Sequence, residues 1–316
     1  MNQENKKYTI TGGAGFIGSN LVDQLINDGH EVIVIDSLIS GKKENINPKA
    51  KFIEADLYGC RQGDTHACSV YTKKVEDAVR GSDAIFHLAA LARVQPSIEN
   101  PSSFNDANVN GTLNMLLIAK KLGIRRFVYS ASSSAYGNAK IFPTPEEHPT
   151  DPLSPYGLQK LIGEQYCRVF SHCYGLETVC LRYFNVFGER QSLEGAYRLV
   201  MGIFANQRLN DKPMTISGDG EQRRDFTYVG DVVRANILAA NCDKVGSGEV
   251  INIGNGDNRS VNQLADLIGG PRINIEARLE PKQTLADNTK AKELLGWLPT
   301  TTIEEWIPKY KKDLGI

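Results

Sequence analysis

The stretch Lys7–Gly18, KYTITGGAGFIG, decides the fold. Its first residues form a short apolar run that predicts a strand, and the residues from Ser19 onward continue as an amphipathic helix. Gly12 permits a tight turn between the two, Gly15 lets backbone approach a ligand without a Cβ, and Gly18 lets the helix pack closely on the strand. The unpaired N–H groups of the helix start would then face an anion. The stretch therefore predicts a pyrophosphate site.

The strand predicted next ends on an acidic residue. Val32–Ile35 is apolar, and Asp36 follows it. A dinucleotide-binding βαβ unit has at this place the acidic residue that binds the ribose. A carboxylate there accepts hydrogen bonds from ribose hydroxyls and repels a 2′-phosphate, although Lys42 and Lys43 just beyond would suit such a phosphate. The complete unit predicts a dinucleotide cofactor, with NAD favoured over NADP.

Length, charge and hydropathy exclude several classes of protein. The chain has 316 residues, of which 41% are hydrophobic and 23% charged, as in ordinary globular proteins. A net charge of −1 gives no field that would collect nucleic acid or an anionic membrane. The apolar runs are too short to cross a bilayer, and the first strand begins too early for a signal peptide. We expect a cytoplasmic protein that binds neither nucleic acid nor membrane.

The six cysteines form no CxxC pair, so we expect reduced, mostly structural thiols. Cys60, His66 and Cys68 fall close together, with Asp64 as a nearby further oxygen ligand. We interpret this segment as an exposed polar loop, and no metal site is predicted. The surrounding residues 58–75 interrupt the rhythm of the chain and are interpreted as an inserted surface loop.

Apolar runs alternate with helical patterns along the first half of the chain. The predicted strands lie at 8–11, 32–35, 52–55, 84–88 and 127–130, with later ones at 178–182 and 250–253. The segment 111–121 predicts a helix with Leu113, Leu116 and Leu117 inward. The alternation predicts an α/β fold, a Rossmann-like doubly wound parallel sheet whose ligands sit at the carboxyl ends of the strands.

The pattern becomes less regular past about residue 180. We expect an NAD-binding Rossmann domain over 1–180, to which a sheet strand near 250–254 returns. The remaining residues, 181–316, are expected to form a smaller mixed α/β domain for the substrate. No clear linker separates the two parts, so they are expected to share a cleft.

A second motif, SPYGLQK at 154–160, predicts the start of a helix. Ser154 suits the N-cap and Pro155 the first helical position, and Tyr156 and Lys160 then share one helix face. A phenol of pKa about 10 is a poor base at neutral pH, but an adjacent ammonium and a positive nicotinamide ring favour the phenolate. The pair alone is common on solvated helices. Downstream of a dinucleotide unit it predicts a proton acceptor at Tyr156.

A third motif, YSASSSAYG at 129–137, predicts a strand that delivers small hydroxyl residues to the edge where cofactor and substrate should meet. Serines at that edge can hydrogen-bond a reacting hydroxyl. The alternative interpretation is an ordinary serine-rich turn.

Together these motifs resemble the extended short-chain dehydrogenase/reductase family, specifically its nucleotide-sugar 4-epimerases, which interconvert UDP-glucose or UDP-N-acetylglucosamine (UDP-GlcNAc) with their galacto forms. The similarity covers nearly the whole chain. The matching segments are TGGAGFIGSN, HLAA at 87–90, SSSAYG, SPYGLQK, LRYFNVFG at 181–188, RRDFTYVGDV at 223–232 and TLADNTKAKELLGW at 284–297. They occur in the family's order.

The resemblance implies a role for each matching position. Tyr156 would be the catalytic base, Lys160 would lower its pKa, and Ser132 would hydrogen-bond the sugar hydroxyl. The residues implied to bind the cofactor are Gly12, Gly15, Phe16, Ile17, Gly18, Asp36, Asp56, Leu57, Leu88, Ala89, Ala90, Lys160 and Tyr183. Those implied to bind the UDP-sugar are Ser132, Ser133, Ser134, Asn185, Arg224, Arg278 and Thr284.

Arg224 also makes sense without the resemblance, because a nearly neutral protein that grips a diphosphate needs a forked cation. The alternative for this residue is an ion pair with Asp225.

The implied reaction moves a hydride from C4 of the sugar to NAD while Tyr156 takes the 4-hydroxyl proton. The 4-keto intermediate then turns over before hydride and proton return. Thr284 stands where, in this family, small residues admit an N-acetyl group, and SASSSAYG and LRYFNVFGERQ resemble the branch that accepts N-acetylhexosamines. We expect UDP-GlcNAc/UDP-GalNAc turnover, with UDP-Glc/UDP-Gal also accepted. The segment 278–284 is one residue shorter than the family's, which leaves open whether Arg278 reaches the phosphates and where Thr284 points.

Several alternatives stay open. A UDP-glucuronate 4-epimerase would share the serines, whereas a 4,6-dehydratase or a sugar-acid decarboxylase would carry acidic residues where Ser133 and Ser134 stand. A sensor that binds NAD or a nucleotide sugar without turnover would have no need of a base beside the nicotinamide. The resemblance further suggests a homodimer through the helices at about 109–122 and 156–174.

Overall fold

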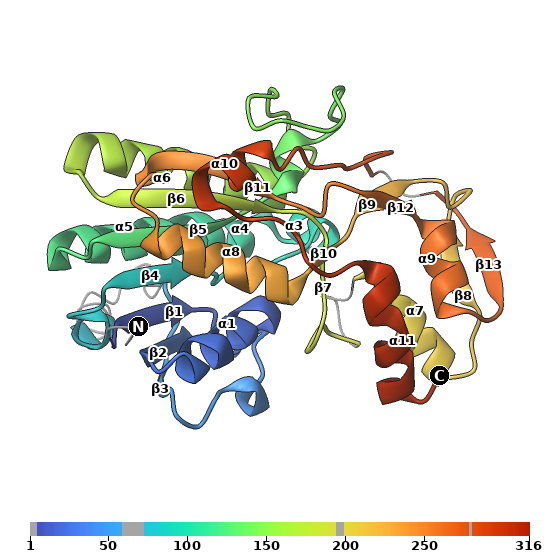
Figure 1. The fold of residues 1–316 in the computed structure, drawn as a ribbon, viewed down its shortest axis with the longest axis horizontal. Coiled ribbons are helices and arrows are strands. Elements are labelled where there is room, and N and C mark those ends of the chain that lie inside the picture. Colours follow the sequence, from blue (N-terminus) through green and yellow to red (C-terminus); the bar gives the residue numbers. More distant parts are fainter. Residues whose placement is uncertain (1–4, 59–72, 194–198, 278–279) are drawn as a thin grey trace.

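A seven-stranded parallel sheet forms the centre of the computed structural model, which describes residues 5–58, 73–193, 199–277 and 280–316. The strands run in the order β11-β6-β5-β4-β1-β2-β3 (Figure 1). They are β1 Lys7–Thr11, β2 Glu31–Asp36, β3 Lys51–Glu54, β4 Ala84–His87, β5 Arg126–Ser132, β6 Glu177–Tyr183 and β11 Ser247–Ile253. The doubly wound α/β fold predicted from the alternation is confirmed. Cys60, His66 and Cys68 lie outside the described residues.

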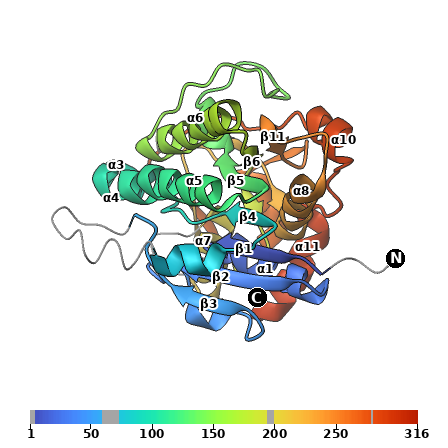
Figure 2. The ribbon, with the colours of Figure 1, turned by 90° about the vertical axis from the view of Figure 1, so that its left-hand side faces the viewer.

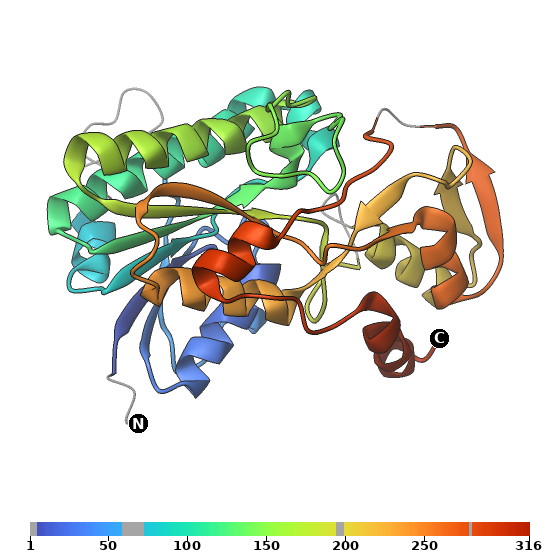
Figure 3. The ribbon, with the colours of Figure 1, turned by 45° about the horizontal axis from the view of Figure 1, so that its top comes forward.

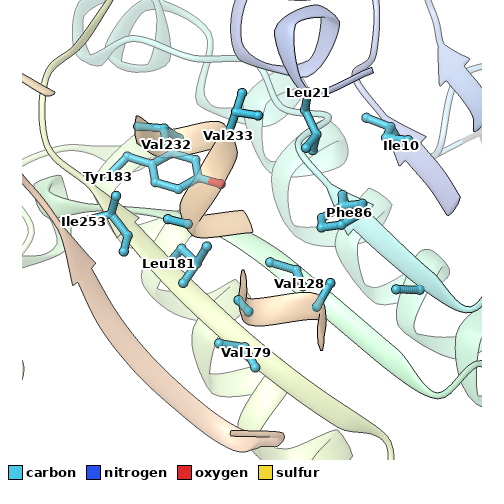
Figure 4. Close-up of a cluster of buried hydrophobic side chains, with 14 of the residues drawn as sticks. Ile10, Leu21, Phe86, Val128, Val179, Leu181, Tyr183, Val232, Val233 and Ile253 are labelled. Carbon is cyan, nitrogen blue, oxygen red and sulfur yellow. The ribbon is translucent and has the colours of Figure 1, made fainter. Parts of the chain in front are cut away.

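Helices cover both faces of the sheet (Figure 2). One face carries α5 Gly111–Leu122 and α6 Pro155–Tyr174, and the other carries α1 Phe16–Asn27, α8 Val229–Asn241 and α10 Thr289–Leu295. The second face buries a hydrophobic core shown in Figure 4, which includes Ile10, Leu21, Phe86, Val128, Leu181, Val232 and Ile253. The first face buries Met115, Leu116, Ile118, Cys167 and Phe170 against the sheet.

One predicted inward residue of α5 points outward. Leu116 is fully buried and Leu113 is half-buried, but Leu117 is 46% exposed. Successive residues of a helix lie about 100° apart, and the inward stripe of α5 is centred on Met115 and Ile118. Leu117 therefore falls outside the stripe.

A smaller unit lies beside the sheet (Figure 3). It contains α7 Val200–Leu209, α9 Val261–Ile268, α11 Ile303–Leu314, β8 Met214–Ser217 and β13 Arg272–Ile275 around a core of its own. Two further small sheets have two strands each. One pairs β7 Val186–Phe187 with β10 Thr227–Tyr228, and the other pairs β9 Arg223–Asp225 with β12 Asn258–Ser260. Because α8, β11 and α10 return to the large sheet, the chain passes between the two units several times. The domain division near residue 180 stays a prediction.

Short helical segments surround the carboxyl ends of the strands. They are η1 Lys43–Asn45, α3 Val94–Glu99, α4 Pro101–Asn105, the π-helical η2 Asp106–Asn110 and η3 Ser133–Tyr136. Within the described ranges, no helix is long and apolar enough to cross a membrane.

The contact between α6 and β5 can be tested through a glycine. A Cβ on Gly163 would lie 2.1 Å from the hydroxyl oxygen of Tyr129. We expect Gly163→Ala to lower the melting temperature, since such overpacking costs about 1–3 kcal/mol. Gly111→Ala is the matched control: its Cβ would lie 3.5 Å from the nearest atom, so the better helix propensity should raise the melting temperature slightly. Equal shifts in both variants would contradict this packing.

Candidate active site

The glycine-rich turn between β1 and α1 leaves no room for side chains. Gly12 has a φ of +74°, and a Cβ there would lie 2.7 Å from the backbone nitrogen of Ala89. A Cβ on Gly18 would lie 2.1 Å from the carbonyl oxygen of Gly12, and one on Gly15 would lie 3.2 Å from the same oxygen. The space between the glycine-rich loop and the first turn of α1 therefore stays free of side chains, as binding of a pyrophosphate requires.

Asp36 lies at the end of β2, and its carboxylate contacts the glycine-rich turn at Ala14. It is 8% exposed, and its carboxylate accepts the N–H groups of Ala14 at 2.9 Å and of Leu38 at 2.8 Å. Burial raises the pKa of this carboxyl group, and the backbone hydrogen bonds oppose that shift. A ribose diol would add further donors, so the site suits the adenosine half of a dinucleotide.

Tyr156 and Lys160 stand on the first turns of α6. Ser154 caps this helix, because its hydroxyl accepts the N–H of Gly157 at 3.1 Å. The N–H of Tyr156 donates to the Ser97 hydroxyl of α3 at 3.1 Å. Lys160 is buried, and its Nζ donates to the carbonyl oxygen of Ser130 at 2.7 Å. The helix start is thus fixed from two sides.

Ser132 ends β5 and faces Tyr156. Its Oγ accepts the N–H of Ser134 at 3.2 Å and the hydroxyl of Ser134 at 2.8 Å. The Ser132 side chain is also hydrogen-bonded to the Tyr156 hydroxyl. Because its acceptor capacity is used by Ser134, its own O–H is the group available to Tyr156.

Burial and charge act in opposite directions on the tyrosine. Burial raises the pKa of Tyr156, while the Ser132 hydrogen bond and the charge of Arg93 lower it. Burial also lowers the pKa of Lys160 to about 8. We expected Lys160 to lower the pKa of Tyr156. In the structure its ammonium donates to the Ser130 carbonyl, and the effect of Lys160 on the pKa of Tyr156 stays a prediction.

Asn185 and Thr284 are far apart in the sequence but in direct contact. The side-chain amide of Asn185 donates to Thr284 Oγ1 at 3.2 Å and to the carbonyl oxygen of Asp225 at 3.2 Å. Thr284 Oγ1 also accepts the N–H of Asp225 at 3.2 Å. These contacts settle where Thr284 points: toward Asn185.

Arg224 lies beside them and is 11% exposed. It forms an ion pair with Glu280, and its Nη1 donates to the carbonyl oxygen of Arg223 at 2.9 Å. The alternative pairing with Asp225 is wrong. That carboxylate instead accepts backbone N–H groups, those of Asn255, Gly256 and Ala286.

A cleft of about 1840 Å³ joins these parts. This exceeds the roughly 300–1,000 Å³ of a site for one drug-sized ligand, so the cleft has room for a dinucleotide and a second large ligand. Every predicted site residue in the described ranges lines it: Gly12, Gly15, Phe16, Ile17, Gly18, Asp36, Asp56, Leu57, Leu88, Ala89, Ala90, Ser132, Ser133, Ser134, Tyr156, Lys160, Tyr183, Asn185, Arg224 and Thr284. The predicted residue Arg278 lies outside those ranges.

The lining also contains residues that were not predicted, among them Arg93 and Gln191. Arg93 follows the HLAA segment and has a φ of 113°, which is rare for a residue with a side chain. Gln191 is 7% exposed, and its side chain faces the hydroxyl of Tyr310. Gln191 lies in a segment already quoted for its resemblance, whereas an unusual φ at Arg93 has no signature in the sequence.

Comparisons with known proteins agree with this arrangement. The profile described as "NAD dependent epimerase/dehydratase family" matches residues 8–254. The UDP-glucose 4-epimerase of Mycolicibacterium smegmatis is 34% identical over 313 residues, covering 95% of this chain and 96% of that protein. The structure of Thermotoga maritima UDP-glucose 4-epimerase with UDP-glucose has a TM-score of 0.88 and 38% identity, covering 98% of this chain and 99% of the other. Methanobrevibacter ruminantium UDP-N-acetylglucosamine 4-epimerase, in complex with UDP-N-acetylmuramic acid, has a TM-score of 0.86 and 35% identity, covering 99% and 96%.

The glycine turn yields a prediction about cofactor binding. We expect Gly12→Ala to lose bound NAD, because its Cβ would displace the backbone at Ala89. Gly29→Ala is the control, since Gly29 has a φ of +88° but nothing within 4 Å. It should cost only about 1 kcal/mol of stability and keep its cofactor. The measurement is NAD released on denaturation together with calorimetric titration of added NAD; equal NAD contents would show that the close approach to Ala89 is unimportant.

Proposed function

Because the chain belongs to the NAD-dependent epimerase/dehydratase family, we propose that it inverts C4 of a UDP-hexose, with UDP-GlcNAc/UDP-GalNAc as its main pair and UDP-Glc/UDP-Gal also accepted. One observation carries this proposal. Ser132, Tyr156 and Lys160 line a single cleft together with the glycine turn and Arg224.

The cofactor half of the cleft suits NAD. The glycine turn and the first turn of α1 would hold its pyrophosphate, Asp36 its adenosine ribose and Lys160 its nicotinamide ribose. Bound NAD supplies an acceptor for the C4 hydride and returns that hydride within the same cycle. Tyr183 also lines the cleft and would border the cofactor. Its hydroxyl donates to Asn236 at 2.9 Å, which fixes the ring.

Tyr156 handles the proton in this proposal. Its phenolate oxygen takes the proton of the sugar 4-hydroxyl and later returns it, while the Ser132 hydroxyl donates to that phenolate oxygen. The phenolate form that this needs is disfavoured by burial and favoured by the Ser132 hydrogen bond. Lys160, fixed on Ser130, keeps the helix start and the strand end in register.

The uridine diphosphate half depends on a forked cation. Arg224 already faces a carboxylate, that of Glu280, so its donors point toward an anionic partner at the wall of the cleft. A diphosphate offers several oxygens in the spacing that a guanidinium prefers. Tight binding of the diphosphate there would hold the nucleotide in place while the 4-keto hexose rotates to present its other face.

Thr284 and Gln191 support the choice of an N-acetylated sugar. Thr284 is small, and its hydroxyl is hydrogen-bonded to Asn185 and Asp225. It therefore projects little into the cleft, which leaves space for an acetamido group. Gln191 adds a buried amide to the lining of the same cleft, which an acetamido group could contact. UDP-glucuronate is the second candidate, because Arg93 adds a cation on the lining that would suit a carboxylate.

A homodimer remains part of the proposal. The outward faces of α5 and α6 carry exposed apolar side chains, those of Leu117, Leu158, Val169 and Tyr174. Burying these side chains between two copies would explain their placement.

The test is incubation of the purified protein with UDP-GlcNAc, UDP-Glc and UDP-glucuronate in turn, without added NAD, followed by chromatography of the nucleotides. We expect UDP-GalNAc to form, which also requires a retained cofactor. Tyr156→Phe should keep its NAD and lose about 10²–10⁴-fold in kcat, since it removes the proton acceptor. Wild-type turnover by a folded, NAD-containing Tyr156→Phe protein would falsify the role of the tyrosine.

Sugar choice gives a separate prediction at Thr284. We expect Thr284→Tyr to reduce kcat/KM for UDP-GlcNAc by roughly 100-fold while changing that for UDP-Glc only a few-fold, because the ring fills the space of the acetamido group. Thr284→Ser keeps the small side chain and its hydroxyl and should leave both rates near wild type. Equal losses on both sugars in Thr284→Tyr would mean that Thr284 does not border the hexose.

A further inference from the structure

Two buried arginine side chains lie on neighbouring strands of the central sheet. Arg126 begins β5 and is 1% exposed, and Arg182 lies near the end of β6 and is 4% exposed. A guanidinium stays charged at any working pH, so burying one is costly unless it is paired and hydrogen-bonded. The partners of each arginine therefore indicate what it is there to hold.

Arg126 stabilises the amino ends of the strands. Its Nη2 donates to Glu177 at 2.9 Å and to the carbonyl oxygen of Cys242 at 3.1 Å, and its Nη1 donates to the carbonyl oxygen of Ala239 at 2.6 Å. These two carbonyl groups belong to the C-terminal end of α8, where the last carbonyl groups of a helix lack partners within it. The contacts explain the burial of Arg126 by structure alone.

Arg182 instead contacts the helix that carries Lys160. Its Nε and Nη2 donate to the two carboxylate oxygens of Glu164 at 2.8 and 2.7 Å, and Glu164 is 1% exposed. Glu164 lies about one helical turn after Lys160 on α6. A bidentate pair fixes the relative orientation of two groups as well as their distance. The pair therefore fixes the register of α6 on β6.

The same guanidinium also contacts the segment that follows Ser132. Its Cζ lies 4.5 Å from the centre of the Tyr136 ring, in a cation–π contact. Tyr136 ends η3, which begins directly after Ser132, and within the sheet Arg182 stands opposite Ala131. One buried side chain thus contacts both α6 and the segment that carries Ser132.

We propose that Arg182 is a positioning residue, which holds Ser132 and Tyr156 at a fixed spacing. It acts on Ser132 through Tyr136 and on Tyr156 through Glu164. The inference rests on the functions proposed above for Ser132 and Tyr156. In the described ranges neither member of the Arg182–Glu164 pair lines the cleft, so the pair acts through the segments that it joins. A buried ion pair adds little stability over well-packed apolar side chains of similar size, and we place its consequence in the geometry.

The first test replaces the pair by apolar side chains. Glu164→Leu alone leaves the guanidinium without its carboxylate and should lower the melting temperature, whereas Glu164→Leu/Arg182→Met should melt near the wild-type temperature. The double variant should keep its NAD and its KM for the UDP-hexose. It should lose about 10–100-fold in kcat, because small displacements of reacting groups cost that much. A double variant with wild-type melting temperature and wild-type kcat would overturn the proposal.

Arg182→Lys separates geometry from charge. Lysine keeps the positive charge but has no bidentate fork, so kcat should fall by roughly 10-fold at unchanged KM. Glu164 also opposes the burial that lowers the pKa of Lys160, and Arg182→Lys leaves that effect in place. Wild-type kcat in Arg182→Lys would show that the bidentate geometry is not needed.

Arg126→Met is the matched control. It removes a second buried guanidinium, from the neighbouring strand, and its former partners Ala239 and Cys242 lie at the end of α8. We expect a lower melting temperature but a wild-type kcat when turnover is measured well below that temperature. A comparable loss of kcat in Arg126→Met would remove any special role for Arg182.

The second test uses no substrate, so it is independent of the proposed reaction. Hydrogen–deuterium exchange read by mass spectrometry reports how firmly each segment is held. In the double variant, peptides covering 132–137 and 154–164 should exchange several-fold faster than in the wild type, while those covering 111–122 should not change. Unchanged exchange in the first two segments would overturn the proposal. Faster exchange there, in a protein whose wild type converts no UDP-hexose, would count against the reaction and not against the fixed spacing.

Discussion

The close approach of two backbones at Gly12 and Ala89 governs the site. Because Gly12 has no side chain, the turn after β1 touches the segment that leaves β4. That segment continues to Arg93 and α3, whose Ser97 receives the N–H of Tyr156. The cofactor turn, the unusual arginine and the proposed base are therefore linked through one continuous stretch of chain. A parallel sheet places all of them at its carboxyl edge.

Burial sets the electrostatic character of the cleft. It raises the pKa of Asp36 and of Tyr156 and lowers that of Lys160, so each group is pushed toward its neutral form. What opposes this in the protein is local: backbone N–H groups at Asp36, and Ser132 with Arg93 at Tyr156. The cleft is therefore responsive to the charges that its ligands bring, since few solvent molecules would screen them.

The sequence predicted the parts of this arrangement that depend on short spacings. The glycine turn, the cap at Ser154, the Tyr156–Lys160 spacing and the serine-rich strand end are local patterns, and the family membership they indicated is confirmed. The failures concern contacts made across the fold. Leu117 was assigned to the wrong face of its helix. Leu116 and Leu117 are adjacent, and the spacing of the leucines alone does not decide which of the two faces the sheet.

The partners of charged groups could not be predicted for the same reason. Arg224 pairs with Glu280, far along the chain, rather than with its neighbour Asp225, whose carboxylate is occupied by backbone donors. Lys160 is held by the backbone carbonyl group of Ser130, and the motif at 129–137 does not indicate this contact. Arg93 was overlooked because backbone strain depends on what surrounds a residue and leaves no pattern in its neighbours.

If Arg224 binds the diphosphate as proposed, its pairing with Glu280 affects the energetics of nucleotide exchange. An arriving diphosphate would replace a carboxylate instead of meeting a bare guanidinium, so the net affinity is the difference between two ionic contacts. On departure the carboxylate can return, and the cation need not be left without a counter-charge. Both epimers of a UDP-sugar carry the same diphosphate, so this exchange costs the same for substrate and product. Such a contact would favour neither direction of the reaction.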